Sequence, residues 1–192
     1  STNLTSIATG MTYDLLMASG MTLVLILGGI DLSVGSILWL TSVITTMALQ
    51  DGVPIPFAIL IGLGVASFCG AINGFVVARL KLAPFIATLG MFYVARGIAG
   101  LRNNGFTFPN LIGRPEYGNT GFEILGAGNL LGINYSIWLM IIITLVAHIV
   151  TKRTPFGRHV YSIGGNERAA ELSGIASRFD CGLGNLGPPD NP

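Results

Sequence analysis

The sequence predicts an all-α membrane protein that crosses the bilayer about four or five times. Hydrophobic residues make up 51% of the 192 residues and charged residues only 10%, whereas roughly 25% of the residues in an average globular protein are charged. The mean hydropathy is +0.69. Several apolar runs are long enough to cross a hydrocarbon core of about 30 Å. Together these observations predict a polytopic helical protein with one helix broken at 28–36 and a short helix on its cytoplasmic side.

The first apolar run, residues 15–49, contains the polar interruption at 28–36. As one straight helix this run would be about 52 Å long, which exceeds a hydrocarbon core of about 30 Å. The run must therefore break, either within one span or between two spans. Polar groups at membrane depth are costly and tend to lie in protein-lined or water-filled cavities. The residues that we assign to the break, or to a translocation path, are Gly28, Gly29, Asp31, Ser33 and Gly35.

Asp31 is the carboxylate of this interruption, and two roles are open for it. It can cap or bond the backbone that a helix break exposes, which is the role we favour. It can instead contact the transported molecule directly. Uptake by a permease carrying Asp31→Asn distinguishes an essential charge from a structural hydrogen bond.

Three further apolar runs have about the length of a membrane span, and they cover residues 57–78, 85–101 and 133–150. Basic residues beside short loops mark the cytoplasmic side of a membrane protein. Arg79 and Lys81 lie between the first two of these runs, and four basic residues follow the last. We therefore expect these two regions in the cytoplasm, and the loop 50–54 and the stretch 102–132 on the opposite side.

Two polar residues inside these runs have open roles. Asn73 lies in the small-residue pattern from Gly70 to Gly74. This pattern either packs helices closely or lines a polar path, where the amide finds partners, so Asn73 joins the candidate path residues. Arg96 lies about two-thirds along its run. It either extends to the outer interface or serves as a counter-ion for Asp31 or a residue of the path.

Sequence signatures of catalysis are absent. The chain has no Gly-x-x-x-x-Gly-Lys-[Ser/Thr] loop, no His-Glu-x-x-His and no Gly-x-Ser-x-Gly. Its two cysteines, Cys69 in an apolar run and Cys181 in the tail, indicate neither a disulfide framework nor a metal site. We therefore expect no catalytic residue, metal or cofactor on this chain. The net charge of +1 gives no argument for a nucleic-acid partner.

The segment after the last span predicts a short helix outside the membrane. Gly164 and Gly165 are expected to break the chain ahead of it. Asn166 is a favourable N-cap, Glu167 suits a first helical turn, and Gly174 suits a C-cap. A helix of about two turns is marginal alone. We therefore expect this helix to be stabilised by docking onto a partner.

Four separated motifs carry a family resemblance. They are Gly-Gly-Ile-Asp-Leu-Ser-Val-Gly-Ser at 28–36, Ala-Ile-Asn-Gly at 71–74, Pro-Phe-Ile-Ala-Thr-Leu-Gly-Met at 84–91, and the segment 157–174. In this order they resemble the permease subunits of bacterial ABC importers for monosaccharides, of the ribose, xylose and arabinose type. The resemblance covers about residues 3–175. Four motifs in the right order identify a family far more specifically than any single motif does.

The resemblance implies the rest of a transport machine in the bacterial inner membrane. Two permeases, here a homodimer embedded in lipid, form the path, and two cytoplasmic ATPase domains that bind the ATP drive it. A periplasmic binding protein delivers the sugar. By this resemblance the segment 166–174 is similar to the coupling helix that sits in a groove on the ATPase. The implied coupling residues are Gly165, Asn166, Glu167, Ala169, Ala170, Leu172 and Gly174.

The sequence departs from the family pattern at its two ends. Family members usually have a first span before the position of Ser1 and several spans after the coupling helix. We therefore expect a permease truncated at both ends, with a partial transmembrane domain at 1–175 and its coupling segment at 154–175. Residues 176–192 are rich in Gly and Pro and no longer resemble the family. They are expected to form a disordered tail.

Two other classes of function stay open. In an ion-coupled secondary transporter or channel, Asp31 would bind a coupling ion at the broken helix. A carrier of this kind does not need the cytoplasmic helix, which favours the ABC permease. A non-functional permease remnant is the other alternative.

Overall fold

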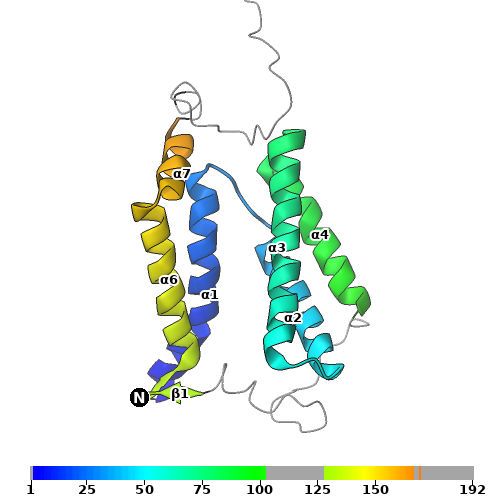
Figure 1. Ribbon diagram of the computed structural model, residues 1–192, viewed down its shortest axis with the longest axis vertical. Helices are drawn as coiled ribbons and strands as arrows, with labels where there is room; N and C mark the ends of the chain where they lie inside the picture. Colours follow the sequence, from blue (N-terminus) through cyan, green and yellow to red (C-terminus); the bar gives the residue numbers. More distant parts are fainter. Residues whose placement is uncertain (1, 103–127, 167–168, 170–192) are drawn as a thin grey trace, which may run out of the picture.

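The computed structural model describes residues 2–102, 128–166 and 169. Its helices and strands are α1 (Thr2–Ile26), α2 (Val34–Gln50), α3 (Ile55–Leu80), α4 (Pro84–Arg102), β1 (Asn129–Leu130), β2 (Ile133–Asn134), α6 (Tyr135–Arg153) and α7 (Pro155–Gly165) (Figure 1). The predicted all-α class is confirmed, because the strands among these described residues form only one two-residue antiparallel pair.

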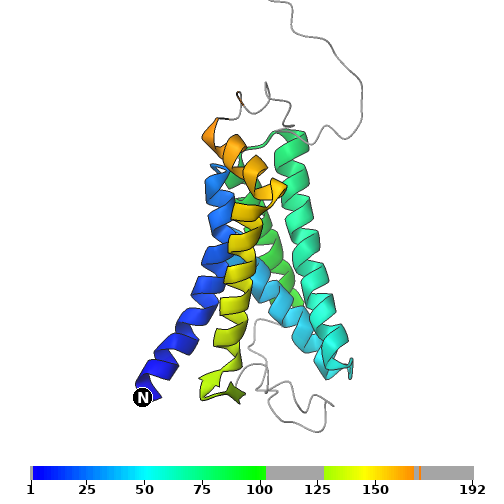
Figure 2. The same ribbon diagram turned by 60° about the vertical axis from the view of Figure 1, so that its left-hand side comes forward.

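The helices form two groups (Figure 1). In one group, α2 packs against both α3 and α4. In the other, α1 and α6 lie side by side, and α7 lies across their common end, as the turned view shows (Figure 2). The buried hydrophobic core belongs to the first group. Its residues are Leu40 and Val43 from α2, Cys69 from α3, and Met91, Ala95 and Ala99 from α4.

The structure shows how the apolar run of residues 15–49 breaks. They form two helices, α1 and α2, with irregular chain between them. By length and composition, α1, α3, α4 and α6 are each long enough to cross a membrane, whereas α2 has 17 residues and is about 25 Å long. In addition, α1 begins at Thr2. The apolar run does not mark this beginning, because polar and small residues fill the first turns of the helix.

The last span begins later than predicted. Ile133 and Asn134 pair with β1 as strand residues, and α6 starts at Tyr135. Asn134 sets this start because its side chain accepts a hydrogen bond from the Ser136 backbone N–H at 3.0 Å, which is the contact of an N-cap.

The helices alternate in direction, which brings the basic ends of α3 and α6 to one end of the molecule, whereas Arg102 ends α4 at the other. The C-terminal ends of α3 and α6, which carry Arg79 and Lys152, lie at the same end of the molecule as α7 (Figure 1). Asp51 directly follows α2, whose C-terminal end lies at the opposite end of the molecule, as does the β1–β2 pair. This is the alternation that the basic residues predict. We call the end of the molecule that carries α7 and the C-terminal ends of α3 and α6 the basic end.

Candidate functional site

The predicted break begins with a glycine turn that ends α1. Gly28 has a φ of 76°, a left-handed conformation that glycine adopts without steric cost. Its N–H bonds the Leu25 carbonyl at 3.0 Å, and the Gly29 N–H bonds the Val24 carbonyl at 3.0 Å. These two bonds form a Schellman motif, which satisfies carbonyls left free at a helix end.

Asp31 binds the backbone at the start of the next helix. Its Oδ1 accepts hydrogen bonds from the Ser33 N–H at 2.7 Å and from the Ser33 Oγ at 2.6 Å. Ser33 is fully buried and occupies the N-cap position of α2, yet its own side chain makes no cap bond. The carboxylate therefore fixes the turn of chain that leads into α2.

Asn73 connects this turn to α3. Its Nδ2 donates to the Ser33 Oγ at 2.9 Å, and the residue is 9% exposed. The buried amide thus finds a partner in the break rather than in helix packing alone. Asp31, Ser33 and Asn73 form one chain of hydrogen bonds from α3 to the break.

Thr88 is a contact residue of the break that sequence reasoning did not assign. Its hydroxyl oxygen lies 3.2 Å from both the Ile30 carbonyl, to which it donates, and the Leu32 N–H, from which it accepts. It also lies 2.9 Å from the Pro84 carbonyl in its own helix. The sequence gives little indication of this contact with the break. A threonine within a helix commonly bonds the carbonyl four residues earlier, so its hydroxyl does not by itself point to a distant partner.

The contacts of the break with α3 and α4 lie at some depth along these helices and not at their ends, although Ile30 and Leu32 are exposed. Asn73 is about 10 Å along α3 from Leu80, and Thr88 is about 6 Å along α4 from Pro84. Both ends are at the basic end of the molecule (Figure 1). Helix α2 therefore begins among the other helices. In its first turn, the buried Ser36 hydroxyl has no hydrogen-bond partner within the described part of the chain.

Two sequence expectations about the break receive no support from these contacts. A Cβ added to Gly35 would meet nothing within 4 Å, so packing does not require glycine there. The structure describes both Arg96 and Asp31, and they form no ion pair with each other. The Arg96 guanidinium lies instead over the Trp39 and Phe92 rings. The counter-ion interpretation of Arg96 is therefore wrong.

Of the two glycines expected to break the chain, Gly165 ends α7, whereas the helix runs through Gly164. Thr154 caps this helix by accepting a hydrogen bond from the Gly157 N–H, and Pro155 occupies its first position, where its fixed φ suits a helix. The glycine at 164 is explained by packing. A Cβ there would collide with the Ile26 carbonyl at the end of α1.

Asn166 follows α7 and makes the contact expected of an N-cap. Its Oδ1 accepts a hydrogen bond from the Ala169 N–H at 3.0 Å. Gly165 is the last residue of α7. The other predicted coupling residues, Glu167, Ala170, Leu172 and Gly174, lie outside the described residues, as do residues 176–192.

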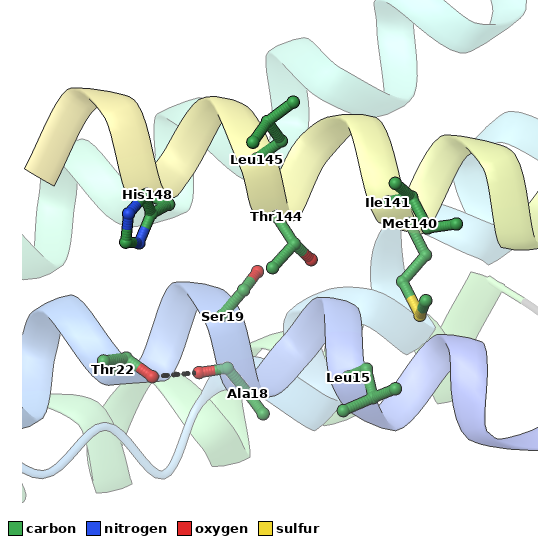
Figure 3. Close-up of a pocket in the computed structure, with 9 residues that line it drawn as sticks. All are labelled: Leu15, Ala18, Ser19, Thr22, Met140, Ile141, Thr144, Leu145 and His148. Carbon is green, nitrogen blue, oxygen red and sulfur yellow. Dashed lines mark hydrogen bonds between the residues drawn. The ribbon is translucent and has the colours of Figure 1, made fainter.

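A groove of about 560 Å³ lies between α1 and α6, away from the break (Figure 3). Ser19 and Thr144 face each other across it, and the His148 ring points toward α1 (Figure 3). None of the predicted site residues lines this groove. The residues that do are Leu15, Ala18, Ser19, Thr22, Met140, Ile141, Thr144, Leu145 and His148.

Known proteins resemble this chain over most of its length. The ribose import permease protein RbsC of Haemophilus influenzae is 39% identical over 173 residues, which are 90% of this chain and 53% of that protein. RbsC of Bacillus subtilis is 39% identical over 83% of this chain and 48% of its own length. The fructose import permease protein FrcC of Rhizobium meliloti is 36% identical over 83% of this chain and 45% of its own length.

This chain spans about half the length of the curated relatives it matches. No solved structure is significantly similar to it. A family profile described as branched-chain amino acid transport system / permease component matches residues 3–179. With its long apolar helices, the chain is thus a multi-pass membrane protein, and it belongs to this family of transport permease components rather than to a family of enzymes.

Proposed function

We propose that this chain is part of the permease subunit of an ABC importer that moves a monosaccharide across the bacterial cytoplasmic membrane. The relatives named above support a sugar as the transported substrate, since their names specify ribose and fructose import. Family membership favours this function over an ion-coupled secondary transporter.

The complete transporter contains further subunits. Two cytoplasmic ATPase subunits bind and hydrolyse the ATP, and a periplasmic protein delivers the sugar. A second copy of the permease completes the path through the membrane. The residues from Gly28 to Gly35 and Asn73 shape that path, and the segment 165–174 receives the ATPase.

The observation that carries the proposal is the contact between α7 and the end of α1. Gly164 lies against the Ile26 carbonyl, and Gly28, at the turn that ends α1, follows two residues later. The segment proposed to bind the ATPase directly follows α7. A displacement of that segment therefore reaches the helix break through one packed contact.

Co-purification with an ATPase subunit tests this function. The full chain, carrying an affinity tag, is co-expressed with the ATPase subunit of a ribose-type importer. We expect co-purification that is lost in Glu167→Lys and in Gly174→Pro. Glu123→Lys is the matched control, because it makes the same charge change in the stretch expected on the opposite side of the membrane. Retention of the ATPase by both coupling variants would refute the proposed docking segment.

A further inference from the structure

Arg96 is a charged side chain deep in a membrane-spanning helix. It lies about 18 Å along α4 from Pro84 and about 9 Å from Arg102. Its side chain is exposed on the surface of the α2–α3–α4 group. An ionised side chain is costly to expose to hydrocarbon, and such residues face a bundle interior or a water-filled cavity. The exposed face of α4 around Arg96 is therefore unsuited to lipid.

The guanidinium points away from the nearer end of α4. It lies over Phe92, one turn toward the N-terminus of α4, with Cζ 5.5 Å from the ring centroid. It also lies over Trp39 of α2, at 5.7 Å. Side chains on a helix lean toward its N-terminus, which here is the basic end. This direction does not favour an extension of Arg96 toward the outer interface.

Two aromatic rings hold this cation, and its hydrogen-bond donors stay free. A guanidinium has five N–H donors, and among the described residues Arg96 makes no hydrogen bond or ion pair with any other. Cation–π contact restrains the group without using the donors at its edges. The result is a positioned, unsatisfied set of donors at membrane depth.

Exposed aromatic surface continues from the two rings that hold the guanidinium. Trp39 is 37% exposed and Tyr93 is 67% exposed. Tyr93 packs edge-to-face against Phe92, with ring centroids 5.2 Å apart and an angle of 87° between the planes. Apolar ring faces and a few fixed polar groups are the usual composition of a small-molecule site.

We propose that Arg96, Trp39 and Tyr93 form a binding surface for a neutral monosaccharide in the translocation path, an assignment that rests on the proposed function. The guanidinium donates to sugar hydroxyls, and the aromatic rings pack against the C–H face of the sugar. A free amino acid fits less well. Its carboxylate would pair with Arg96, but no acidic side chain in the described part of the chain lies beside Arg96 to receive its ammonium group.

Trp39 fluorescence reports binding directly. The chain has two tryptophans, so Trp138→Phe leaves Trp39 as the single reporter in the full chain, reconstituted in lipid nanodiscs. D-ribose, D-fructose and L-leucine are titrated separately. We expect a saturable fluorescence change with at least one sugar and none with L-leucine. Arg96→Gln should weaken the sugar response about tenfold, as when a charge-assisted hydrogen bond is lost.

Two further variants serve as controls for this titration. Arg102→Gln removes the same charge at the end of α4 and should leave the response unchanged. Arg96→Lys keeps the charge but not the planar fork of donors, so it should give an intermediate loss. A saturable response to L-leucine alone, no response to either sugar, or an unchanged sugar response in Arg96→Gln would each overturn the proposal.

Water accessibility gives a second readout that is independent of fluorescence. Tyr93→Cys is placed in a background with Cys69→Ala and Cys181→Ser, and it is treated with a membrane-impermeant, charged thiol reagent. We expect labelling that D-ribose or D-fructose slows, whereas Ile142→Cys in α6 stays unlabelled. An unlabelled Tyr93→Cys, whether covered by lipid or by a second copy of the chain, would overturn the proposal. ATPase co-purification does not involve Arg96, so the proposed function can hold when this surface fails.

Discussion

Gly164 of α7 packs directly against the backbone carbonyl of Ile26, the last residue of α1. The contact joins the helix that leads into the predicted coupling segment to the helix that ends at the break. Backbone lies on both sides of it, so no flexible side chain can absorb a displacement. The two elements are therefore expected to move together.

Gly164→Ala should destabilise the protein by about 1–3 kcal/mol, the usual cost of overpacking a close contact. The free energy of unfolding, from a dodecyl sulfate titration in mixed micelles, measures it. Gly165→Ala is the matched control, because a Cβ at the next position meets nothing within 4 Å. Equal stabilities of the two variants would show that α7 does not rest on α1.

Gly28→Ala should cost about 1–2 kcal/mol, because a side chain is strained at the left-handed φ of this residue. Gly35→Ala offers the contrast. Its position is helical and uncrowded, so alanine should be neutral or stabilise by up to about 1 kcal/mol. Unfolding titrations of both variants check this. A large loss in Gly35→Ala would point to a requirement that packing does not explain.

Ser33 and Asn73 should show an energetic coupling of about 0.5–1.5 kcal/mol, the net contribution of a typical hydrogen bond. A double-mutant cycle with Ser33→Ala and Asn73→Ala measures it. Ser42→Ala replaces Ser33→Ala in the control cycle, because among the described residues the Ser42 hydroxyl bonds only the Leu38 carbonyl of its own helix. Additive effects in the Ser33 cycle would show that the break is not fastened to α3.

Asp31→Asn should keep most of the stability, since the amide oxygen can still accept from the Ser33 N–H and hydroxyl. Asp31→Ala should lose about 1–3 kcal/mol, because both donors are left without this acceptor. The comparison separates a hydrogen-bond acceptor from an essential charge. A loss in Asp31→Asn as large as in Asp31→Ala would indicate that the charge itself is needed.

Thr88→Val should cost about 1–3 kcal/mol. Valine has a similar shape but leaves the Leu32 N–H and the Ile30 carbonyl without the hydroxyl between them. Thr41→Val should be nearly neutral, because the Thr41 hydroxyl is exposed and, within the described part of the chain, bonds only the Leu38 carbonyl. Thermal unfolding of both variants in detergent checks the difference. Similar melting temperatures of the two variants would show that the Thr88 hydroxyl does not stabilise the break.

Hydrophobic runs allowed the spans to be located from the sequence. The predicted run 57–78 lies within α3, and 85–101 lies within α4, because a membrane helix has to be apolar over its length. The length of the run 15–49 required a break, and the polar residues placed it at 28–36. Its internal bonds were only partly foreseeable. Asp31 was expected to bond exposed backbone, but its Ser33 partner depends on the fold of the turn.

Tertiary contacts account for what the sequence did not indicate. Thr88 meets the break from a helix more than 50 residues away, which no local pattern records. The helix α7 continues through Gly164 because its glycine fits against Ile26, whereas glycines in sequence more often indicate a chain break. The direction of the Arg96 side chain depends on the direction of α4 and on the contact of its guanidinium with Trp39, which lies on another helix.

The partners of the break also fix the order in which it can form during synthesis. Ser33 bonds a side chain 40 residues later, and the Ile30 carbonyl bonds one 58 residues later. While the chain leaves the ribosome, α1 and α2 are therefore made before either partner exists. The turn between them stays incomplete until α3 and α4 have entered the membrane. Helix α4 is thus the element whose insertion closes this part of the fold.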